Sequence, residues 1–273
     1  LNRQRLLFLV LIINTENKLP DSPIQPMPTK NKYWALVPAA GIGKRLGAKT
    51  PKQYLKLHGK ELLVWTLQTL SELEYLERIV LVLHPDDDYF YTNLSKDFPN
   101  ILVVSGGQER QHSVAYGLDL LKTLAQGDDW IFVHDAVRPC VTKDDINKLK
   151  NALENDEVGG ILASRVKDTL KHSDVSISAE GSLASEGSLK VSSTLNRDEY
   201  WLAATPQLFR FKVLLDAFSP MQESGQNATD EAVAVEALGL PVKIIEGRSD
   251  NIKITSQEDL ALAEFLLKQL GGN

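Results

Sequence analysis

The segment Val37-Pro38-Ala39-Ala40-Gly41-Ile42-Gly43-Lys44-Arg45-Leu46 joins an apolar stretch to a loop of small residues and cations. Small residues let backbone N–H groups come close to an anion, and fixed cations add positive charge. A further cation, Lys52, follows in Pro51-Lys52-Gln53-Tyr54. The pattern predicts a buried strand that ends in a triphosphate-binding loop. The alternative is an ordinary glycine-rich turn whose cations lie in solvent.

The glycine spacing of this loop excludes the two commonest phosphate-binding motifs. Gly41, Gly43 and Gly47 miss the dinucleotide fingerprint G-x-G-x-x-G by one residue. The chain also contains no G-x-x-x-x-G-K-[ST] run, which a P-loop requires. The loop therefore predicts a different kind of nucleotide site.

Composition indicates a globular protein. The chain has 273 residues, of which 43% are hydrophobic and 24% charged. Its net charge of −6 argues against a nucleic-acid coat or a membrane-surface protein, although local cations can still bind a phosphorylated ligand. The single cysteine, Cys140, excludes an intramolecular disulfide and a cysteine-based zinc site. We expect a free thiol in a cytoplasmic protein.

The N-terminal segment differs from the rest. The apolar run Leu6 to Ile13 has eight residues, too few to span a bilayer, and no small-x-small cleavage site follows it. Residues 14–32 are polar and contain four prolines. We expect 1–31 to be a disordered extension or the product of a start that is too early, and 32–271 to be the folded domain.

From residue 33 onward, apolar strand patterns alternate with helical ones. Strands are expected at 33–38, 78–84, 101–104, 130–134, 158–164 and near 241–246, and helices at 61–73, 109–125, 142–155 and near 210–218, 229–239 and 256–270. This alternation predicts an α/β fold with a mostly parallel sheet covered by helices on both faces. Ligands of such sheets bind outside the carboxyl ends of the strands.

One segment interrupts the alternation. Residues 171–193 are rich in serine and glycine, and short alternating runs flank them at 166–170 and 191–195. We expect a β-hairpin arm over 168–197 that projects from the core. The alternative is a flexible loop.

Two segments carry chemistry at expected strand ends. Asp135 follows the strand at 130–134, where a carboxylate suits a magnesium ion shared with phosphate oxygens. The alternative for Asp135 is a capping role. The turn Gly106-Gly107-Gln108-Glu109-Arg110-Gln111-His112-Ser113 can offer backbone groups and Ser113 to a base or phosphate, or can be only a tight strand–helix connection.

Two later segments leave similar choices. Thr229-Asp230-Glu231 has the pattern of a helix N-cap with acids in the first turn, a role that is compatible with ligand binding. Asp250-Asn251-Ile252-Lys253-Ile254-Thr255 is expected to place Lys253 in a short apolar strand. An inward lysine there needs an anionic partner, whereas an outward one is only solvated.

The ordered set of these motifs carries a resemblance. Pro-Ala-Ala-Gly-x-Gly-x-Arg, Pro-Lys-Gln-Tyr, Gly-Gly-x-x-Arg-x-x-Ser-Val, His-Asp-Ala-x-Arg-Pro, Lys-Asp-Thr, Thr-Pro-Gln, Thr-Asp-Glu and Asp-Asn-Ile-Lys-Ile-Thr occur in that order. Residues from about 33 to 270 thereby resemble the 2-C-methyl-D-erythritol 4-phosphate cytidylyltransferases of the non-mevalonate isoprenoid pathway. The resemblance implies a Rossmann-like nucleotidyltransferase fold and transfer of CMP from CTP to the polyol phosphate, with release of pyrophosphate.

The resemblance also implies roles for individual residues. Catalytic residues would be Arg45, Lys52 and Lys253. Nucleotide-binding residues would be Ala39, Ala40, Gly41, Gly107, Gln108, Ser113, Asp135 and Ala136, with Asp135 also near a magnesium ion. The polyol phosphate would be held by Asp135, Arg138, Thr169, Arg197, Thr205 and Thr229. Thr169 and Arg197 would reach the partner's site in a homodimer formed through the arm.

Two departures and two rival functions remain. Gln108 stands where many members carry an acid facing the cytosine amino group, although its carbonyl can still accept that bond. The arm is longer than usual, which affects how it docks. One rival is a related enzyme that cytidylylates ribitol 5-phosphate. The other is a regulatory nucleotide-binding domain without catalysis, which the joint presence of Arg45, Lys52, Asp135 and Lys253 disfavours.

Overall fold

The computed structural model describes residues 31–41, 50–173, 190–224 and 228–270, and at 221–224 it describes the backbone only. The chain separates into the units Leu1–Lys30 and Asn31–Asn273, and every described residue belongs to the second. The predicted extension 1–31, apart from Asn31, therefore lies outside the described residues. So does Arg45 of the phosphate loop.

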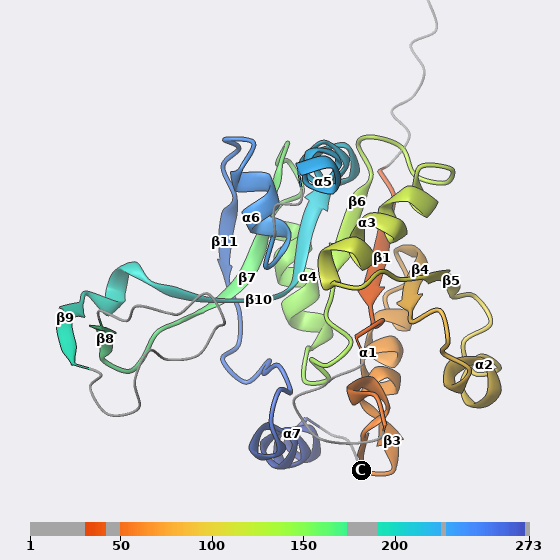
Figure 1. The fold of residues 1–273 in the computed structure, drawn as a ribbon, viewed down its shortest axis with the longest axis horizontal. Coiled ribbons are helices and arrows are strands. Elements are labelled where there is room, and N and C mark those ends of the chain that lie inside the picture. Colours follow the sequence, from red (N-terminus) through yellow and green to blue (C-terminus); the bar gives the residue numbers. More distant parts are fainter. Residues whose placement is uncertain (1–30, 42–49, 174–189, 225–227, 271–273) are drawn as a thin grey trace, which may run out of the picture. The chain divides into compact units, whose positions relative to one another are not determined.

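A mixed sheet forms the centre of the second unit (Figure 1). In the described part of the chain it has the order β11-β7-β10-β6-β1-β4-β5. β1 pairs in parallel with β4 and β6, β4 with β5, and β11 with β7, whereas β10 runs antiparallel to both β6 and β7. The strands are β1 Tyr33–Pro38, β4 Leu76–Leu83, β5 Leu102–Ser105, β6 Trp130–Val133, β7 Gly159–Arg165, β10 Trp201–Arg210 and β11 Lys243–Glu246.

Helices cover both faces of the sheet, as the sequence predicts. Successive residues of a strand point to opposite faces, so Trp130 and Phe132 of β6 join one core while Ile131 and Val133 join the other. The first core includes α1 (Leu62–Ser71) and α4 (Lys143–Ala152); the second includes α3 (Arg110–Leu121), α5 (Phe211–Ser224) and α6 (Glu231–Glu236). The remaining elements are α2 Tyr89–Asn93, α7 Gln257–Gln269, β2 Lys56–Leu57, β3 Lys60–Glu61 and the short 3-10 helices η2 Lys52–Tyr54 and η3 Arg197–Glu199.

Most of the predicted elements are present, but some differ. The strand β10, the short hairpin β2–β3 and the helix α2 are not among the predicted elements. The predicted strand at 250–255 is wrong, because these residues join no sheet. Two of their backbone groups bond outside any sheet: the Ile254 N–H donates to Val137 O at 3.0 Å, and Asn251 O accepts from Arg138 Nη1 at 2.7 Å.

The predicted hairpin is confirmed. β8 (Leu170–Ser173) and β9 (Val191–Leu195) pair antiparallel, and Figure 1 shows them at the left, beside the main sheet. Residues 174–189 of the predicted arm lie outside the described part. Exposed apolar side chains occur on and next to the hairpin, with Val191 61% and Leu202 58% exposed.

The parallel strands bring distant loops to one edge of the sheet. The chain leaves β1 with the Ala39 N–H bonded to Val82 O at 2.8 Å, and it leaves β6 with the His134 N–H bonded to Leu36 O at 3.0 Å. After β5, the Gly106 N–H bonds Leu83 O at 2.7 Å. A Cβ at Gly106 would come within 2.4 Å of Ala40 Cβ, so only glycine allows these two loops to meet.

Candidate active site

A pocket of about 260 Å³ opens at this edge. Its lining draws on distant segments of the chain, from Pro38 to Thr255. It includes Gln53, Glu109, Arg110 and Val137, which carried no predicted role. It brings together these predicted site residues: Ala39, Ala40, Gly41, Lys52, Gly107, Gln108, Ser113, Asp135, Ala136 and Lys253. Arg138, Thr169, Arg197, Thr205 and Thr229 do not line it.

The first wall is the end of β1 with the turn that carries Lys52. Among the described residues, a Cβ at Gly41 would meet no atom within 4 Å, so none of them closes off the backbone of Gly41 at the pocket. Lys52 lies on η2, and its Nζ is 3.5 Å from Thr255 O across the pocket. The buried Gln53 fastens this turn by donating from Nε2 to Ala39 O at 2.8 Å. The chain from Ala39 to Gly41 and the Lys52 cation therefore line one space, which suits a polyphosphate.

The second wall is the turn before α3. Ser113 Oγ accepts from the Gly107 N–H at 3.3 Å and donates to Glu109 O at 3.2 Å. The side chain of Ser113 is buried, whereas Gln108 at the tip of the turn is exposed to the pocket. The turn is both a tight connection and a polar wall, so the two alternatives for this segment are compatible.

Asp135 lies at the back of the pocket among cations. Arg110 Nε is 2.9 Å from Oδ1, and Lys253 Nζ is 2.8 Å from Oδ2. Burial alone would raise the pKa of the Asp135 carboxyl, but the charges of Arg110, Lys253 and Arg138 hold it well below its usual range. Lys253 thus lines the pocket with its side chain 43% exposed, and it has the anionic partner that an inward lysine would need.

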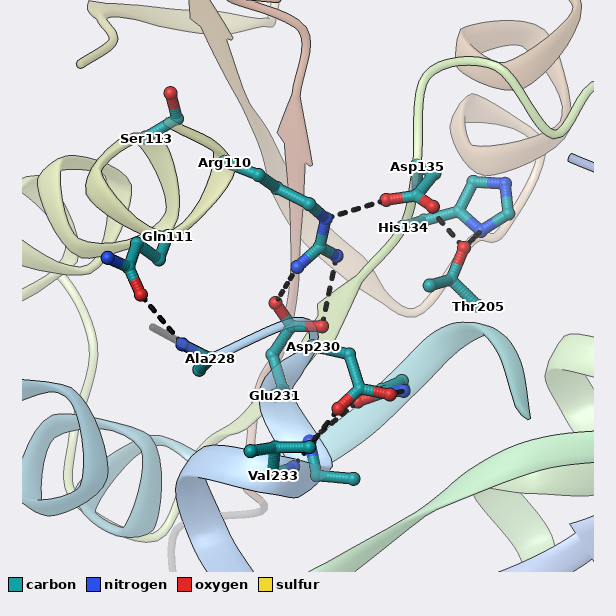
Figure 2. Close-up of polar contacts among 12 residues, drawn as sticks. Arg110, Gln111, Ser113, His134, Asp135, Thr205, Ala228, Asp230, Glu231 and Val233 are labelled. Carbon is teal, nitrogen blue, oxygen red and sulfur yellow. Dashed lines mark hydrogen bonds and ion pairs between the residues drawn. The ribbon is translucent and has the colours of Figure 1, made fainter. Parts of the chain in front are cut away.

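Arg110 bridges two buried acids (Figure 2). Besides Asp135, it binds Glu231 at the start of α6, with Nη1–Oε1 and Nη2–Oε2 distances of 2.6 and 3.1 Å. The side chain of Glu231 is completely buried. Although burial disfavours a charge, these two carboxylates raise the pKa of Arg110, which therefore stays protonated.

Thr205 is placed behind Asp135 rather than on the pocket wall. Its Oγ1 accepts from the Asp135 N–H at 3.0 Å and lies 3.0 Å from His134 Nδ1 (Figure 2). Because the Arg138 carbonyl oxygen, 3.3 Å from His134 Nε2, can only accept, the ring proton belongs on Nε2, and Nδ1 accepts from the Thr205 hydroxyl. Burial is the main cause that lowers the pKa of His134 to about 4, so the ring is neutral at pH 7.

Arg138 lies beside Asp135 and is bonded to the backbone of Asn251. Nε of Arg138 is 3.7 Å from Asp135 Oδ2, too far for a hydrogen bond. Within the described residues this Nε and Asn251 Oδ1 are buried atoms without a hydrogen-bond partner. Since buried polar groups are normally paired, the Arg138 Nε suits an oxygen that accepts, whereas the Asn251 Oδ1 suits a donor such as a water or a hydroxyl group.

The Thr229-Asp230-Glu231 segment is a helix start, as predicted. Asp230 caps α6 by accepting from the Val233 N–H at 3.0 Å. The buried Gln207 also binds both sides of this turn, donating to Asp230 Oδ2 and accepting from the Ala232 N–H at 2.9 Å each. Thr229 itself is exposed. Gln207 of the motif Thr-Pro-Gln therefore holds in place the turn formed by the motif Thr-Asp-Glu.

The remaining predicted residues lie on the arm. Thr169 and Arg197 are exposed, and Arg197 Nη1 donates to Lys167 O. Neither lines the pocket of its own chain. This placement leaves their predicted contribution to a partner's site untested.

Other kinds of site receive no support. Burial raises the pKa of the Cys140 thiol to about 12, so this cysteine is a poor nucleophile. No group of three His, Cys, Asp or Glu side chains suited to a metal occurs within the described ranges. A search of the same residues finds no helix of the length and hydropathy needed to cross a bilayer.

Sequence reasoning missed the supporting residues. Gln53, Arg110, Gln207 and Glu231 all stand inside quoted motifs, but no role was assigned to them. Their partners are far away in the chain: Arg110 and Glu231 are separated by 121 residues. The signal available in the sequence was a polar residue inside a motif that an apolar helix follows. This signal does not identify the distant residue to which the polar residue binds.

Cations on two segments that meet in one sheet-edge pocket suit the transfer of a nucleotidyl group, and nucleotidyltransferase is the class of protein that this fold and site fit. The sequence model of the 2-C-methyl-D-erythritol 4-phosphate cytidylyltransferase family matches residues 33–269, and the chain belongs to this family.

Relatives and solved structures agree with this membership. The chain is 45% identical over 243 residues to the 2-C-methyl-D-erythritol 4-phosphate cytidylyltransferase of Pseudoalteromonas translucida, covering 89% of this chain and 94% of the relative. It is 41% identical over 241 residues to that of Hahella chejuensis, covering 88% and 95%. The crystal structure of the Francisella tularensis enzyme is similar with a TM-score of 0.71 at 34% identity, covering 87% of this chain and all (100%) of that one. A crystal structure of a 4-diphosphocytidyl-2C-methyl-D-erythritol synthase gives a TM-score of 0.72 at 35% identity, covering 88% and 99%.

Proposed function

We propose that this chain transfers CMP from CTP to the phosphate of 2-C-methyl-D-erythritol 4-phosphate, giving 4-diphosphocytidyl-2-C-methyl-D-erythritol and pyrophosphate. Family membership gives the activity, and the observation that carries it to particular residues is the meeting of Lys52, Lys253 and Asp135 in one pocket. An acceptor phosphate oxygen attacks the α-phosphorus, and the bond from that phosphorus to the bridging oxygen of pyrophosphate breaks. The protein forms no covalent bond in this scheme.

The cations act on the charge of the reacting phosphates. The backbone of Ala39, Ala40 and Gly41 cradles the triphosphate. Lys52 and Arg45 stabilise negative charge that develops on the α-phosphate and on the leaving pyrophosphate. Lys253 is held by Asp135 at 2.8 Å, which aims its ammonium at the transferred phosphate. Gly107, Gln108 and Ser113 bind cytosine, and Asp135 with Ala136 lies near the ribose.

A magnesium ion fits this site only in company with the substrate. Asp135 is the buried carboxylate on the pocket wall, and its pKa stays low, so it is ionised and can act as a ligand. Magnesium is usually bound by one or two carboxylates and completed by phosphates and water. We therefore assign Asp135 as its protein ligand, with the ion neutralising phosphate charge when bound.

The acceptor is held on the side of Arg138, Thr205 and Thr229. Arg138 lies beside Asp135 with a buried Nε that has no hydrogen-bond partner among the described residues, and Thr205 acts by fixing the Asp135 backbone. Thr169 and Arg197 complete the site of the other subunit in a homodimer. The exposed Val191 and Leu202 support this arrangement, because apolar side chains on an arm are stabilised when a partner covers them. The cytoplasmic location stays a prediction.

Turnover with two acceptors tests the proposal against its rivals. Pyrophosphate release from CTP is measured with 2-C-methyl-D-erythritol 4-phosphate, with ribitol 5-phosphate and with no acceptor. We expect release with the first acceptor alone. Preference for ribitol 5-phosphate would move the chain to the related enzyme, and tight CTP binding without release under any condition would favour the non-catalytic nucleotide-binding domain.

A further inference from the structure

One arginine joins two acids that come from distant parts of the chain. Arg110 donates to Asp135 through Nε at 2.9 Å and to both oxygens of Glu231 through Nη1 and Nη2 at 2.6 and 3.1 Å (Figure 2). The Glu231 side chain is fully buried and that of Asp135 is 8% exposed. Because the guanidinium is a rigid planar fork, bonds on two sides fix the relative position of both carboxylates.

Arg110 and Glu231 adjoin different parts of the site, the pocket and the segment with Thr229. Arg110 begins α3, directly after the Gly-Gly turn that lines the pocket, whereas Glu231 begins α6, two residues after Thr229. A second bond joins the same segments, since the Ala228 N–H donates to Gln111 Oε1 at 2.8 Å (Figure 2). The start of α3 therefore holds residues 228–231 in place.

We propose that Arg110 is a positioning residue for the transfer reaction. Its fork keeps the Asp135 carboxylate and the segment 228–231 in one geometry, so that the acceptor approaches the nucleotide in line. This inference rests on the proposed assignment of Thr229 to the acceptor. Arg110 acts through its two partners, and a displacement of ~1 Å in such a site can cost on the order of a hundredfold in rate.

A merely structural role would have a different signature. In that case Arg110 would only neutralise the buried Glu231. Removing one member of a buried ion pair is strongly destabilising, whereas replacing both members by apolar residues of similar volume is often neutral. The double variant Arg110→Met/Glu231→Leu therefore separates folding from positioning.

We expect Arg110→Met alone to lower the thermal midpoint and the double variant to recover most of it. The kcat/KM for 2-C-methyl-D-erythritol 4-phosphate should stay about a hundredfold below that of the unmodified protein in both. Recovery of both the midpoint and kcat/KM in the double variant would overturn the positioning role.

A second variant keeps the proposal testable if the double variant does not fold. Arg110→Lys keeps the charge but cannot bind both acids as a fork. We expect a reduced kcat/KM for the acceptor at a temperature well below its thermal midpoint. Unchanged kinetics in Arg110→Lys would show that charge alone suffices, and the inference would then be wrong.

Arg210 offers a matched control at the opposite end of the sheet. Its guanidinium donates to the carbonyl oxygens of Asp128 and Asp156 and lies 3.9 Å from the centre of the Trp130 ring. Arg210→Met should lower the thermal midpoint and leave kcat/KM unchanged; an equal loss of kcat/KM would mean that the Arg110 effect only follows stability. Thr229→Ala separates the two hypotheses: normal acceptor kinetics there would reject the acceptor assignment, whereas normal kinetics in the Arg110 variants would reject the positioning role.

Discussion

Nε2 of Gln53 donates a hydrogen bond of 2.8 Å to the carbonyl oxygen of Ala39, and this bond fastens the turn that carries Lys52 to the end of β1. The next residue is anchored as well, because the Tyr54 hydroxyl lies 2.8 Å from both carboxylate oxygens of Asp87. The motif Pro-Lys-Gln-Tyr thus supplies one residue for the chemistry and two that hold it in position.

Lys52→Ala should lower kcat by on the order of a hundredfold, because the ammonium stabilises charge that develops in the transition state. Its unfolding free energy should change by less than about 1 kcal/mol, as expected for a partly exposed side chain. Lys56→Ala is the matched control, since Lys56 is 57% exposed and pairs with Glu61 instead of lining the pocket. Rates and thermal midpoints of both variants decide; near-normal turnover of Lys52→Ala would refute the role.

Gln53→Met, unlike Lys52→Ala, should lower both stability and turnover. Methionine fills a similar volume but leaves the buried Ala39 carbonyl without its donor, which costs about 1–3 kcal/mol. Turnover should also fall, because the Lys52 turn is no longer fastened. Denaturant unfolding and steady-state rates measure the two effects. A loss of stability with unchanged kcat would show that the bond serves the fold alone.

The free energy of unfolding should decrease as the pH is lowered, because of His134. Its pKa is lowered from 6.5 to about 4, mainly by burial, so the unfolded chain binds more protons between these values. The stabilisation is complete above pH 6.5 and is lost as the pH falls toward 4, by roughly 3 kcal/mol at 1.4 kcal/mol per pKa unit. The unfolding free energy is measured against pH for the unmodified protein and for His134→Asn, whose amide oxygen can still accept from Thr205. The unmodified protein should show the steeper dependence on pH and His134→Asn the flatter one. Equal slopes would contradict this assignment.

Subunit mixing tests the arm. If Arg197 completes the partner's site, a heterodimer of Arg197→Ala and Lys52→Ala subunits has one site with both lesions and one site with neither. Exchange between two inactive homodimers mixed in equal amounts should then restore activity toward about a quarter of the normal value, because about half of the dimers are then heterodimers and each has one intact site of two. If the arm serves its own subunit, each site keeps one lesion, and verified exchange without recovered activity would reject the crossed arrangement.

The local elements could be predicted from the sequence because their signals are local. The apolar run at 33–38 and the three-to-four spacing over 109–125 correspond to β1 and α3. β10 was missed because Ala203, Ala204 and Pro206 have little strand propensity, and proline cannot donate to a ladder. Two neighbouring strands, β6 and β7, nevertheless hold it, and its register with β7 shifts between Ala204 and Gln207.

The candidate site was predictable only in part, for a related reason. Residues that face the pocket, such as Lys52 and Asp135, follow strands or turns and carry chemistry that a motif displays. Residues that hold them, such as Arg110 and Glu231, depend on partners that only the folded chain brings together. The motifs carried the resemblance and with it the predicted roles. The structure separates the residues that line the pocket from those that support them.

The most direct measurement follows the oxygens of the acceptor phosphate. The protein is given CTP and 2-C-methyl-D-erythritol 4-phosphate whose phosphate carries a heavy oxygen isotope, and both products are analysed by mass spectrometry. Attack by that phosphate on the α-phosphorus predicts a 4-diphosphocytidyl product that keeps all of the label, including the new bridging oxygen, and pyrophosphate that carries none. Label in pyrophosphate, or a bridging oxygen without label, would contradict the proposed transfer.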